Sequence, residues 1–282
     1  MPPSFEPHSI SAHGLALHVR QRHPAGTRAV LFLHGWLDHS RSFDWVLEHL
    51  PDTWRLILLD FRGMGRSEHV PPGGSYSFSD YLLDVECTLD GLGLETVHLV
   101  GHSLGGVVGA AYAAARPQRI QSLTLIESLG PLGGPPEAAL ERLRGFLDDA
   151  RRPPHRKRYA SVEEAAARLR ENNPSLTEAA SLHLARYGTE PLEGGVVFRF
   201  DPLHRRRFGL GFDEAQWLAI LGALSCPVQV LHGSHGLSFE DAQTRARLAA
   251  LRSPLPLTLS GGHHVHMEQP EAVARALEHF IR

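Results

Sequence analysis

The chain has 282 residues, of which 42% are hydrophobic, and this suffices for one large core with an inserted lid. Its formal net charge of −3 leaves no overall basic or acidic excess, so we expect no nucleic-acid partner and no membrane partner. Two cysteines, no secretory leader and no apolar run of bilayer length lead us to expect a soluble, cytoplasmic protein.

The first part of the chain alternates between predicted strands and helices. Apolar residues at alternate positions over 10–19 predict a half-buried hairpin, and the apolar run over 29–33 predicts a buried strand. The next predicted elements are a helix over 43–50, a strand over 54–59, a helix over 81–92 and strands over 97–100 and 123–126. Strands that alternate with helices indicate a mostly parallel central sheet with helices on both faces.

A sharp corner is predicted where the strand over 97–100 ends. The motif Gly-His-Ser-Leu-Gly at 101–105 follows that strand, and a helix of small residues over 107–115 comes next. Glycines two residues before and two after a serine permit a tight strand-to-helix turn that exposes the hydroxyl. The turn also aims the helix N-terminus at the group under attack. Ser103 is therefore the candidate nucleophile.

The segment 131–211 has a different character, because helical patterns there are mixed with Pro, Arg and Glu. Helices are predicted over 137–150, 161–171 and 175–187, and capping-box patterns begin at Ser161 and Ser175. We expect a helical cap inserted over the carboxyl edge of the sheet, with the core formed by 1–130 and 212–282. Basic runs at 151–158 and 204–207 are best explained as a solvated face, with steering of anionic substrates as the alternative.

After the cap, the alternating pattern resumes with a strand over 228–231, a helix over 239–251, a strand over 255–259 and a helix over 270–281. A serine hydroxyl needs a base to remove its proton, and a third group must orient that base. The best base is His263, which lies between the last strand and the last helix. This loop should lie at the carboxyl edge of the sheet beside Ser103.

Four motifs occur in an order that resembles the α/β-hydrolase fold superfamily. They are His-Gly-Trp at 34–36, Asp-Phe-Arg-Gly-Met-Gly-Arg-Ser at 60–67, the Ser103 corner, and the loop from Gly-His at 262–263 to Glu-Gln-Pro at 268–270. The ending at 262–267 and the segment 232–236 are most similar to serine hydrolase-like proteins. The resemblance implies an oxyanion hole formed by the backbone N–H groups of Leu104 and Trp36. The Trp36 ring would wall the acyl pocket or, alternatively, pack in the core.

The acid of the expected triad departs from the family pattern. Most members place an aspartate in a Gly-x-x-Asp turn after the next-to-last strand, but the matching turn here ends at Gly236. Two carboxylates are the candidates. Glu127 directly follows a predicted strand, as in some branches of the superfamily, whereas Asp241 lies near a helix start, where the helix dipole already favours it. We favour Glu127, with Asp241 as the alternative.

Further candidates line the expected substrate pocket or suggest a metal. His34 and His102 adjoin the oxyanion loop and the nucleophile, and Tyr187 and Phe198 come from the cap, where they could equally form its core. The histidines at 263, 264 and 266 lack a second ligand group at a known spacing, so we expect no metal and no cofactor.

The predicted function is a serine hydrolase, in particular a carboxylesterase that cleaves small to medium esters through an acyl-enzyme on Ser103. The alternatives are an acyltransferase, a thioesterase, a lactonase or a C–C bond hydrolase with the same triad, because the fold does not choose among them. A further alternative is a non-enzymatic ligand-binding protein, suggested by the glycine at the usual acid position. We expect a small ester-like substrate and a monomer or homodimer.

Overall fold

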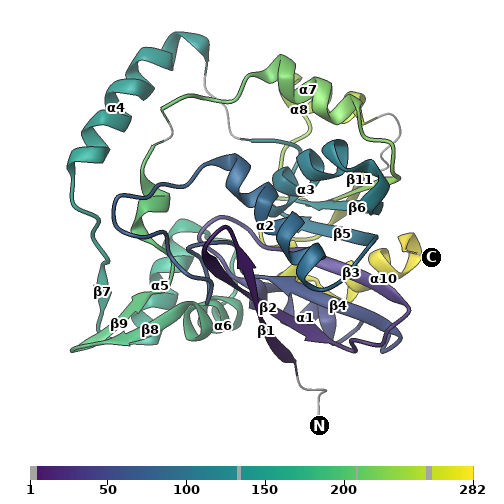
Figure 1. Cartoon of the computed structure of the whole chain (residues 1–282), viewed down its shortest axis with the longest axis horizontal. Coiled ribbons are helices and arrows are strands. Elements are labelled where there is room, and N and C mark those ends of the chain that lie inside the picture. Colours follow the sequence, from purple (N-terminus) through teal and green to yellow (C-terminus); the bar gives the residue numbers. More distant parts are fainter. Residues whose placement is uncertain (1–4, 132–134, 208, 252–255, 282) are drawn as a thin grey trace.

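A central sheet of eight strands organises the molecule (Figure 1). The computed structural model describes residues 5–131, 135–207, 209–251 and 256–281. Across the sheet the strand order is β1-β2-β4-β3-β5-β6-β10-β11. The strands are β1 (Glu6–Ala12), β2 (Leu15–Arg22), β3 (Arg28–Leu33), β4 (Trp54–Leu59), β5 (Val97–His102), β6 (Ile120–Ile126), β10 (Val228–Gly233) and β11 (Pro256–Leu259). Residue 255, where the last strand was predicted to begin, lies outside the described residues.

The strand directions confirm the predicted mostly parallel sheet. Strand β2 runs antiparallel to both β1 and β4, and the neighbours from β4 to β11 run parallel to each other. The helices of this part are α1 (Asp44–Leu47), α2 (Phe78–Gly91), α3 (Leu104–Ala115), α7 (Glu214–Gly222), α8 (Ala242–Ala250), α9 (Val265–Glu268) and α10 (Pro270–Phe280). The helix predicted over 43–50 is shorter than expected, because a 3₁₀ turn over Ser40–Phe43 precedes α1.

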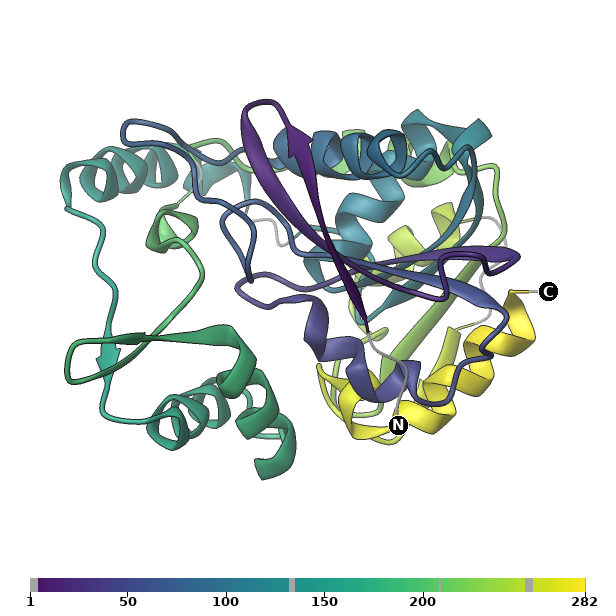
Figure 2. The same ribbon diagram turned by 60° about the horizontal axis from the view of Figure 1, so that its bottom comes forward.

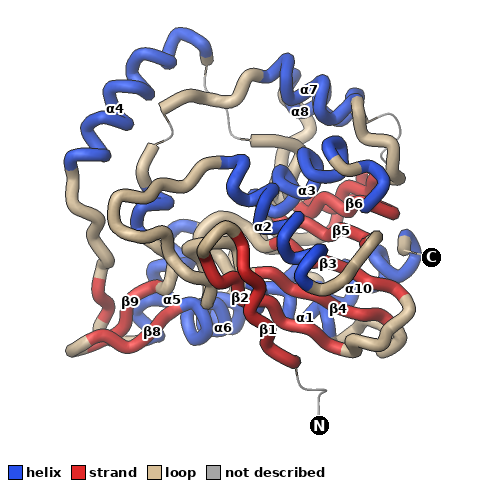
Figure 3. Tube along the Cα trace, in the orientation of Figure 1, coloured by secondary structure: helices blue, strands red, loops and turns tan. Residues whose placement is uncertain are grey.

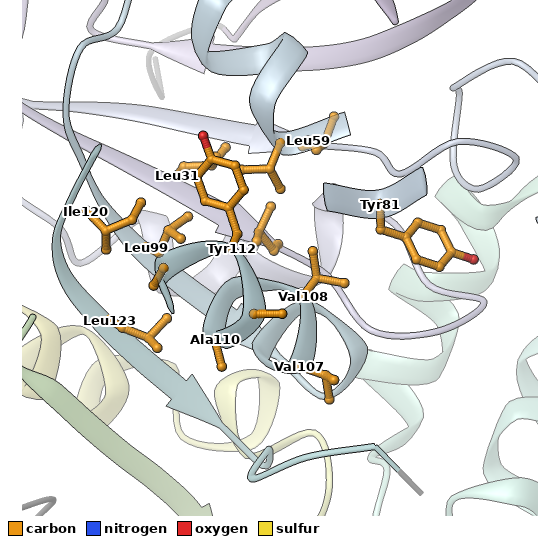
Figure 4. Packing of buried hydrophobic residues seen from close by; sticks show 14 of the residues in the cluster. Leu31, Leu59, Tyr81, Leu99, Val107, Val108, Ala110, Tyr112, Ile120 and Leu123 are labelled. Atoms are coloured by element: carbon orange, nitrogen blue, oxygen red, sulfur yellow. The ribbon is translucent and has the colours of Figure 1, made fainter. Parts of the chain in front are cut away.

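Two apolar layers cover the two faces of the sheet, because successive side chains of a strand point to opposite sides. In β3, Leu31 and Leu33 join the core beneath α2, α3 and α7, whereas Val30 and Phe32 join the core beneath α1, α9 and α10. Figure 4 shows side chains of α3, including Val108, packed over Leu99 and Leu123 of the neighbouring strands. The sheet is therefore buried on both faces, as the apolar runs predicted.

Between β6 and α7 lies the inserted region, which Figure 2 shows beside the sheet. Its elements are α4 (Ala139–Arg151), β7 (Arg158–Tyr159), α5 (Val162–Asn172), α6 (Glu178–Gly188), β8 (Thr189–Leu192) and β9 (Gly195–Phe198). The three helices were predicted. A separate sheet of order β7-β9-β8, visible as a second group of strands in Figure 3, was not. The bounds 131–211 for a cap domain stay a prediction.

The two predicted capping boxes have different outcomes. Ser161 caps α5, since its side chain accepts a hydrogen bond from the N–H of Glu164. The box at Ser175 is wrong: α6 begins at Glu178, and Thr177 accepts from the N–H of Ala180 instead. Among the described residues, no helix combines the length and apolarity that a membrane span requires.

Strand register brings the ends of four strands to one edge. Gly101 of β5 pairs with Leu33 at the end of β3 and with Leu125 of β6, and Ile126 pairs with Leu231 of β10. The residues that directly follow these strands therefore lie at the same edge. They include Ser103 and Glu127, which the sequence places after β5 and β6.

Candidate active site

Ser103 occupies a strained turn between β5 and α3. Its backbone angles are φ 49° and ψ −116°, and its N–H donates to the carbonyl of Ile126 over 2.9 Å. A Cβ on Gly101 would overlap the carbonyl group of Gly105, and one on Gly105 would overlap that of Leu33. Both glycines are therefore required by close backbone contacts, which explains the spacing of the motif.

The two residues expected to supply the oxyanion donors both belong to segments next to Ser103. Leu104 is the first residue of α3, so its N–H has no acceptor within the helix. On the other side is the loop after β3, because a Cβ on Gly35 would lie 3.5 Å from the Cβ of Ser103. The adjacent Trp36 is 51% exposed, so its ring does not pack in the core, and its place in the wall of an acyl pocket stays a prediction.

Of the two candidate acids, the structure brings Glu127 to His263. Glu127 follows β6 at a positive φ of 51°, and its carboxylate is buried. One oxygen accepts the N–H of Gly233 over 2.6 Å, and the other accepts the N–H of Leu237 over 2.8 Å. The second oxygen also lies 3.3 Å from Nδ1 of His263. The carboxylate is thus fixed by two main-chain donors and faces the histidine.

Gly236, at the position where most members of the family place the acid, lies next to the Glu127 carboxylate. A Cβ at Gly236 would overlap the carboxylate of Glu127. The side chain from the end of β6 therefore fills the space into which a residue at 236 would project. With Glu127 in this position, a side chain at 236 would force the carboxylate to shift.

Asp241, the alternative candidate for the acid, caps a helix. It precedes α8 as its N-cap, and its carboxylate accepts the N–H of Thr244 over 2.8 Å. Hydrogen bonding from Thr244 lowers the pKa of Asp241. The helix-start explanation accounts for this residue.

His102 ties the nucleophile corner to the loop that carries His263. Nε2 of His102 lies 2.7 Å from the main-chain oxygen of His263, to which it donates, and the two rings lie 4.9 Å apart between centroids. Burial lowers the pKa of His102 well below its ordinary value, so the ring is neutral at pH 7. His102 therefore supports the loop, and nearly all of its surface is buried.

His34 plays a similar part at the end of β3. Its Nε2 accepts the N–H of Phe61 over 3.0 Å, so Nδ1 carries the proton and donates to the carbonyl of Gly35 over 2.7 Å. Burial lowers the pKa of His34. Both histidines predicted to line the pocket are thus buried and hydrogen-bonded to main-chain groups of the loops near Ser103, and their place in a pocket stays a prediction.

The two aromatic residues predicted from the cap have other neighbours. The guanidinium of Arg41 lies over the ring of Tyr187 at the end of α6. Its central carbon is 4.1 Å from the centroid of the Tyr187 ring. Phe198 is 8% exposed and packs against Tyr159 and Phe200 in the core of the inserted region. Their contacts among the described residues do not place them against Ser103, so the core alternative holds for Phe198.

Helix α6 rests on the loop of His263, a contact that the sequence did not predict. Leu176 and Leu184 pack in one apolar cluster with Met267, four residues after His263. Nε2 of His39 also donates to the carbonyl of Leu184 over 3.0 Å. No local pattern could reveal this docking, because it joins segments far apart in the chain. It places α6 beside the loop that carries His263.

Hydrogen bonds and ion pairs hold the segment 60–67 in place. The Asp60 carboxylate accepts the N–H of Ser40 over 2.7 Å and that of Arg66 over 2.9 Å, and it pairs with His18. The side chain of Arg62 pairs with buried Asp84. The bond from Ser40 ties the loop after β4 to the 3₁₀ turn before α1, and the Arg62 pair ties it to α2.

Comparison with known proteins agrees with this geometry. A family model described as alpha/beta hydrolase fold matches residues 28–270. The serine hydrolase-like protein of Danio rerio is 28% identical over 270 residues, which cover 92% of this chain and 83% of the relative.

Two solved structures extend the similarity to the whole fold. A hypothetical protein from Pseudomonas aeruginosa PAO1 is 32% identical, with a TM-score of 0.90 and coverage of 98% of this chain and 99% of that one. The thioesterase domain from the curacin biosynthetic pathway is 28% identical, with a TM-score of 0.86 and the same coverage. Both similarities include the inserted region as well as the sheet.

Proposed function

Since the chain belongs to the α/β-hydrolase fold family, we propose that it hydrolyses small to medium carboxylic esters through an acyl-enzyme on Ser103. At the coarser level it is a serine hydrolase-like α/β hydrolase. The observation that supports turnover is the buried Glu127 carboxylate, which lies 3.3 Å from Nδ1 of His263. The acid stands at the end of β6 and not in the turn after β10, where most members of the family have it. A carboxylate therefore still faces the histidine.

In the proposed reaction, His263 removes the proton of the Ser103 hydroxyl as the oxygen attacks the ester carbonyl. The carbonyl electrons move to its oxygen, and the resulting oxyanion is stabilised by the N–H groups of Leu104 and Trp36. Collapse of this intermediate expels the alcohol, which takes the proton from His263. A water molecule, deprotonated by His263, then attacks the acyl carbon, and collapse of this second intermediate breaks the bond to Ser103, whose oxygen takes the proton back from His263.

Glu127 acts through His263 in this scheme. Its carboxylate keeps the proton of the neutral imidazole on Nδ1, so that Nε2 can accept the proton of Ser103, and it stabilises the imidazolium that forms. Because the carboxylate is held by the N–H groups of Gly233 and Leu237, its position depends on the β10 loop.

A fluorophosphonate probe tests whether the serine is activated. We expect rapid labelling of the natural chain, none in Ser103→Ala, and a loss of labelling in His263→Ala. Circular dichroism of each variant shows whether it is folded. Absence of labelling in the folded natural chain would identify a ligand-binding protein and overturn the proposal.

Turnover of p-nitrophenyl esters tests the acid. Glu127→Gln should lower kcat by about 10⁴-fold, by analogy with loss of the triad carboxylate in serine proteases, while Asp241→Asn should leave it nearly unchanged. Near-natural activity in the first variant with collapse in the second would transfer the role to Asp241.

Thioester hydrolysis is a second candidate, favoured by the similarity to the curacin thioesterase domain. The same residues would perform it, since only the leaving group changes from an alcohol to a thiol. Matched oxygen esters and thioesters of graded acyl length distinguish the two. A kcat/KM for thioesters that exceeds the ester value at every acyl length would replace the ester proposal.

A further inference from the structure

Beneath the nucleophile, three side chains from three different loops converge. Asp38 comes from the loop after β3, His102 ends β5, and His266 lies in α9. Their carboxylate oxygen and ring nitrogens all lie within 4.8 Å of one another. The proposed triad does not use these atoms.

Each of these three side chains also has polar atoms that lack a hydrogen-bond partner among the described residues. They are Oδ2 of Asp38, Nδ1 of His102 and both ring nitrogens of His266, and none of these atoms is exposed to solvent. His102 is 1% exposed and His266 0%. A buried polar atom without a partner costs roughly 1–3 kcal/mol, so a cluster of four needs an explanation.

A proton count shows that these groups cannot satisfy one another. His102 donates through Nε2 to the carbonyl of His263, so its Nδ1 offers only a lone pair. The carboxylate of Asp38 also offers only lone pairs. Neutral His266 has one N–H and one lone pair. The three side chains therefore offer lone pairs but only one N–H donor among them. A site with more acceptors than donors favours a bound cation.

Two features of His102 match a metal ligand. Histidines that bind metals usually donate their other ring N–H to a carboxylate or main-chain carbonyl, as His102 does to His263. In addition, Gly35 leaves space beside the free nitrogen, because a Cβ there would approach Nδ1 to 3.0 Å. Nδ1 of His264 is also buried without a partner, and its ring lies 5.2 Å from that of His102.

We propose that Asp38, His102 and His266 bind one divalent transition-metal ion of the zinc type, with His264 or water in the remaining position. Two imidazoles and a carboxylate are a ligand set typical of such ions. Zinc bonds of about 2.0–2.2 Å require ligand atoms roughly 3.4 Å apart, so the side chains close slightly on binding.

The ion would join three parts of the proposed active site. Asp38 follows the oxyanion loop, His102 precedes Ser103, and His266 lies three residues after His263. Binding would therefore stabilise their mutual arrangement without touching the substrate. The expectation of no metal was based on the lack of a second ligand group, and the fold supplies that group from Asp38 and His102.

Cobalt titration of the chelator-treated full chain tests the site. We expect visible d–d absorption that saturates at one equivalent, is displaced by Zn²⁺, and is accompanied by a rise in Tm that Mg²⁺ does not produce. Folded protein that gives no absorption and no shift in Tm would mean that only water fills the cluster, and would overturn the proposal.

Variants locate the bound ion. His266→Phe keeps an aromatic ring against Phe43 but removes both nitrogens, and Asp38→Asn keeps the shape of the side chain without its charge. Each should weaken cobalt binding at least tenfold, whereas the exposed control His49→Ala should not. If His266→Phe does not fold, Asp38→Asn decides. Unchanged affinity in the folded ligand variants would place the ion elsewhere and overturn the assignment.

Discussion

The carboxyl edge of the sheet and the inserted region are built on different principles. At the edge, Ser103 and Glu127 are held by main-chain hydrogen bonds at positive φ, and glycines nearby leave no room for another side chain. In the inserted region, α4 leaves Leu140 58% and Leu147 61% exposed. The residues proposed for the chemistry are thus held by the backbone, whereas the exposed side chains of α4 can change at little cost to stability.

The largest expected effect comes from moving the acid between its two positions. Glu127→Gly should reduce ester turnover by about 10⁴-fold because His263 loses its carboxylate. Adding Gly236→Asp should restore a large part of that loss, since the space vacated by Glu127 becomes available to the new side chain. Steady-state kinetics on one p-nitrophenyl ester measures both steps.

The single variant Gly236→Asp is the matched control for this exchange. With Glu127 present, its Cβ would collide with the carboxylate, so we expect reduced activity and a lower Tm. A double variant as inactive as Glu127→Gly, though folded, would show that the two positions are not equivalent. Activity would then depend on the backbone conformation at position 127 and not only on where the carboxylate lies.

The next largest effect is expected on stability, when a methyl group is added to Gly105 at the carboxyl edge of the sheet. Gly105→Ala should destabilise the fold by about 3 kcal/mol or more, since its Cβ would overlap the carbonyl of Leu33. Gly222→Ala is the control, because a Cβ there meets nothing within 4 Å. Urea unfolding measures both, and equal stabilities for the two variants would contradict a rigid edge.

The sheet and its carboxyl edge could be predicted from sequence more completely than the inserted region. The strands, the Ser103 corner and the mostly parallel sheet follow from periodicity and from glycine spacing, which are local signals. Glu127 could be chosen because it directly follows a strand. By contrast, β8 has four residues and includes Pro191, and β7 has two, too few for a periodic pattern.

What sequence could not reveal depends on contacts between distant segments. The overlap of Glu127 with position 236 joins residues more than 100 positions apart, as does the convergence of Asp38 with His266. Ser175 fails as a cap for a similar reason: its side chain lies against Gly262 in the histidine loop, where a Cβ would overlap it. Tertiary packing therefore decided these positions against the local pattern.

A third prediction concerns pH and the buried histidines of the edge. Burial, and secondarily the neighbouring imidazoles, lowers the pKa of His266 well below its ordinary value, and burial lowers that of His264 to about 4. Unfolded histidines bind protons below about pH 6.5, while these folded ones stay neutral. The contribution of these histidines to the free energy of unfolding should therefore be fully present above pH 6.5. It should decrease as the pH drops towards 4.

His266→Phe isolates one member of this set. Because one titrating group is removed, the slope of unfolding free energy between pH 6.5 and 5 should decrease by up to about 1.4 kcal/mol per pH unit. Urea titrations in a chelator exclude any effect of a bound metal. His49→Ala, at an exposed position, is the control for the removal of a histidine. An unchanged slope in His266→Phe would mean that the folded ring already takes up a proton.

The smallest effect is expected when a carboxylate of the inserted region receives the same change as Glu127. Glu190 pairs with Arg156 over 2.6 Å and with Arg199 over 3.0 Å, and its side chain is 34% exposed. Glu190→Gln should cost about 0.2–1 kcal/mol, since solvent screens such pairs and Gln keeps an acceptor oxygen. Ester turnover should stay close to that of the natural chain, in contrast to Glu127→Gln. A tenfold loss of kcat in Glu190→Gln would show that this carboxylate reaches the chemistry, and the division between a fixed edge and an exchangeable inserted region would fail.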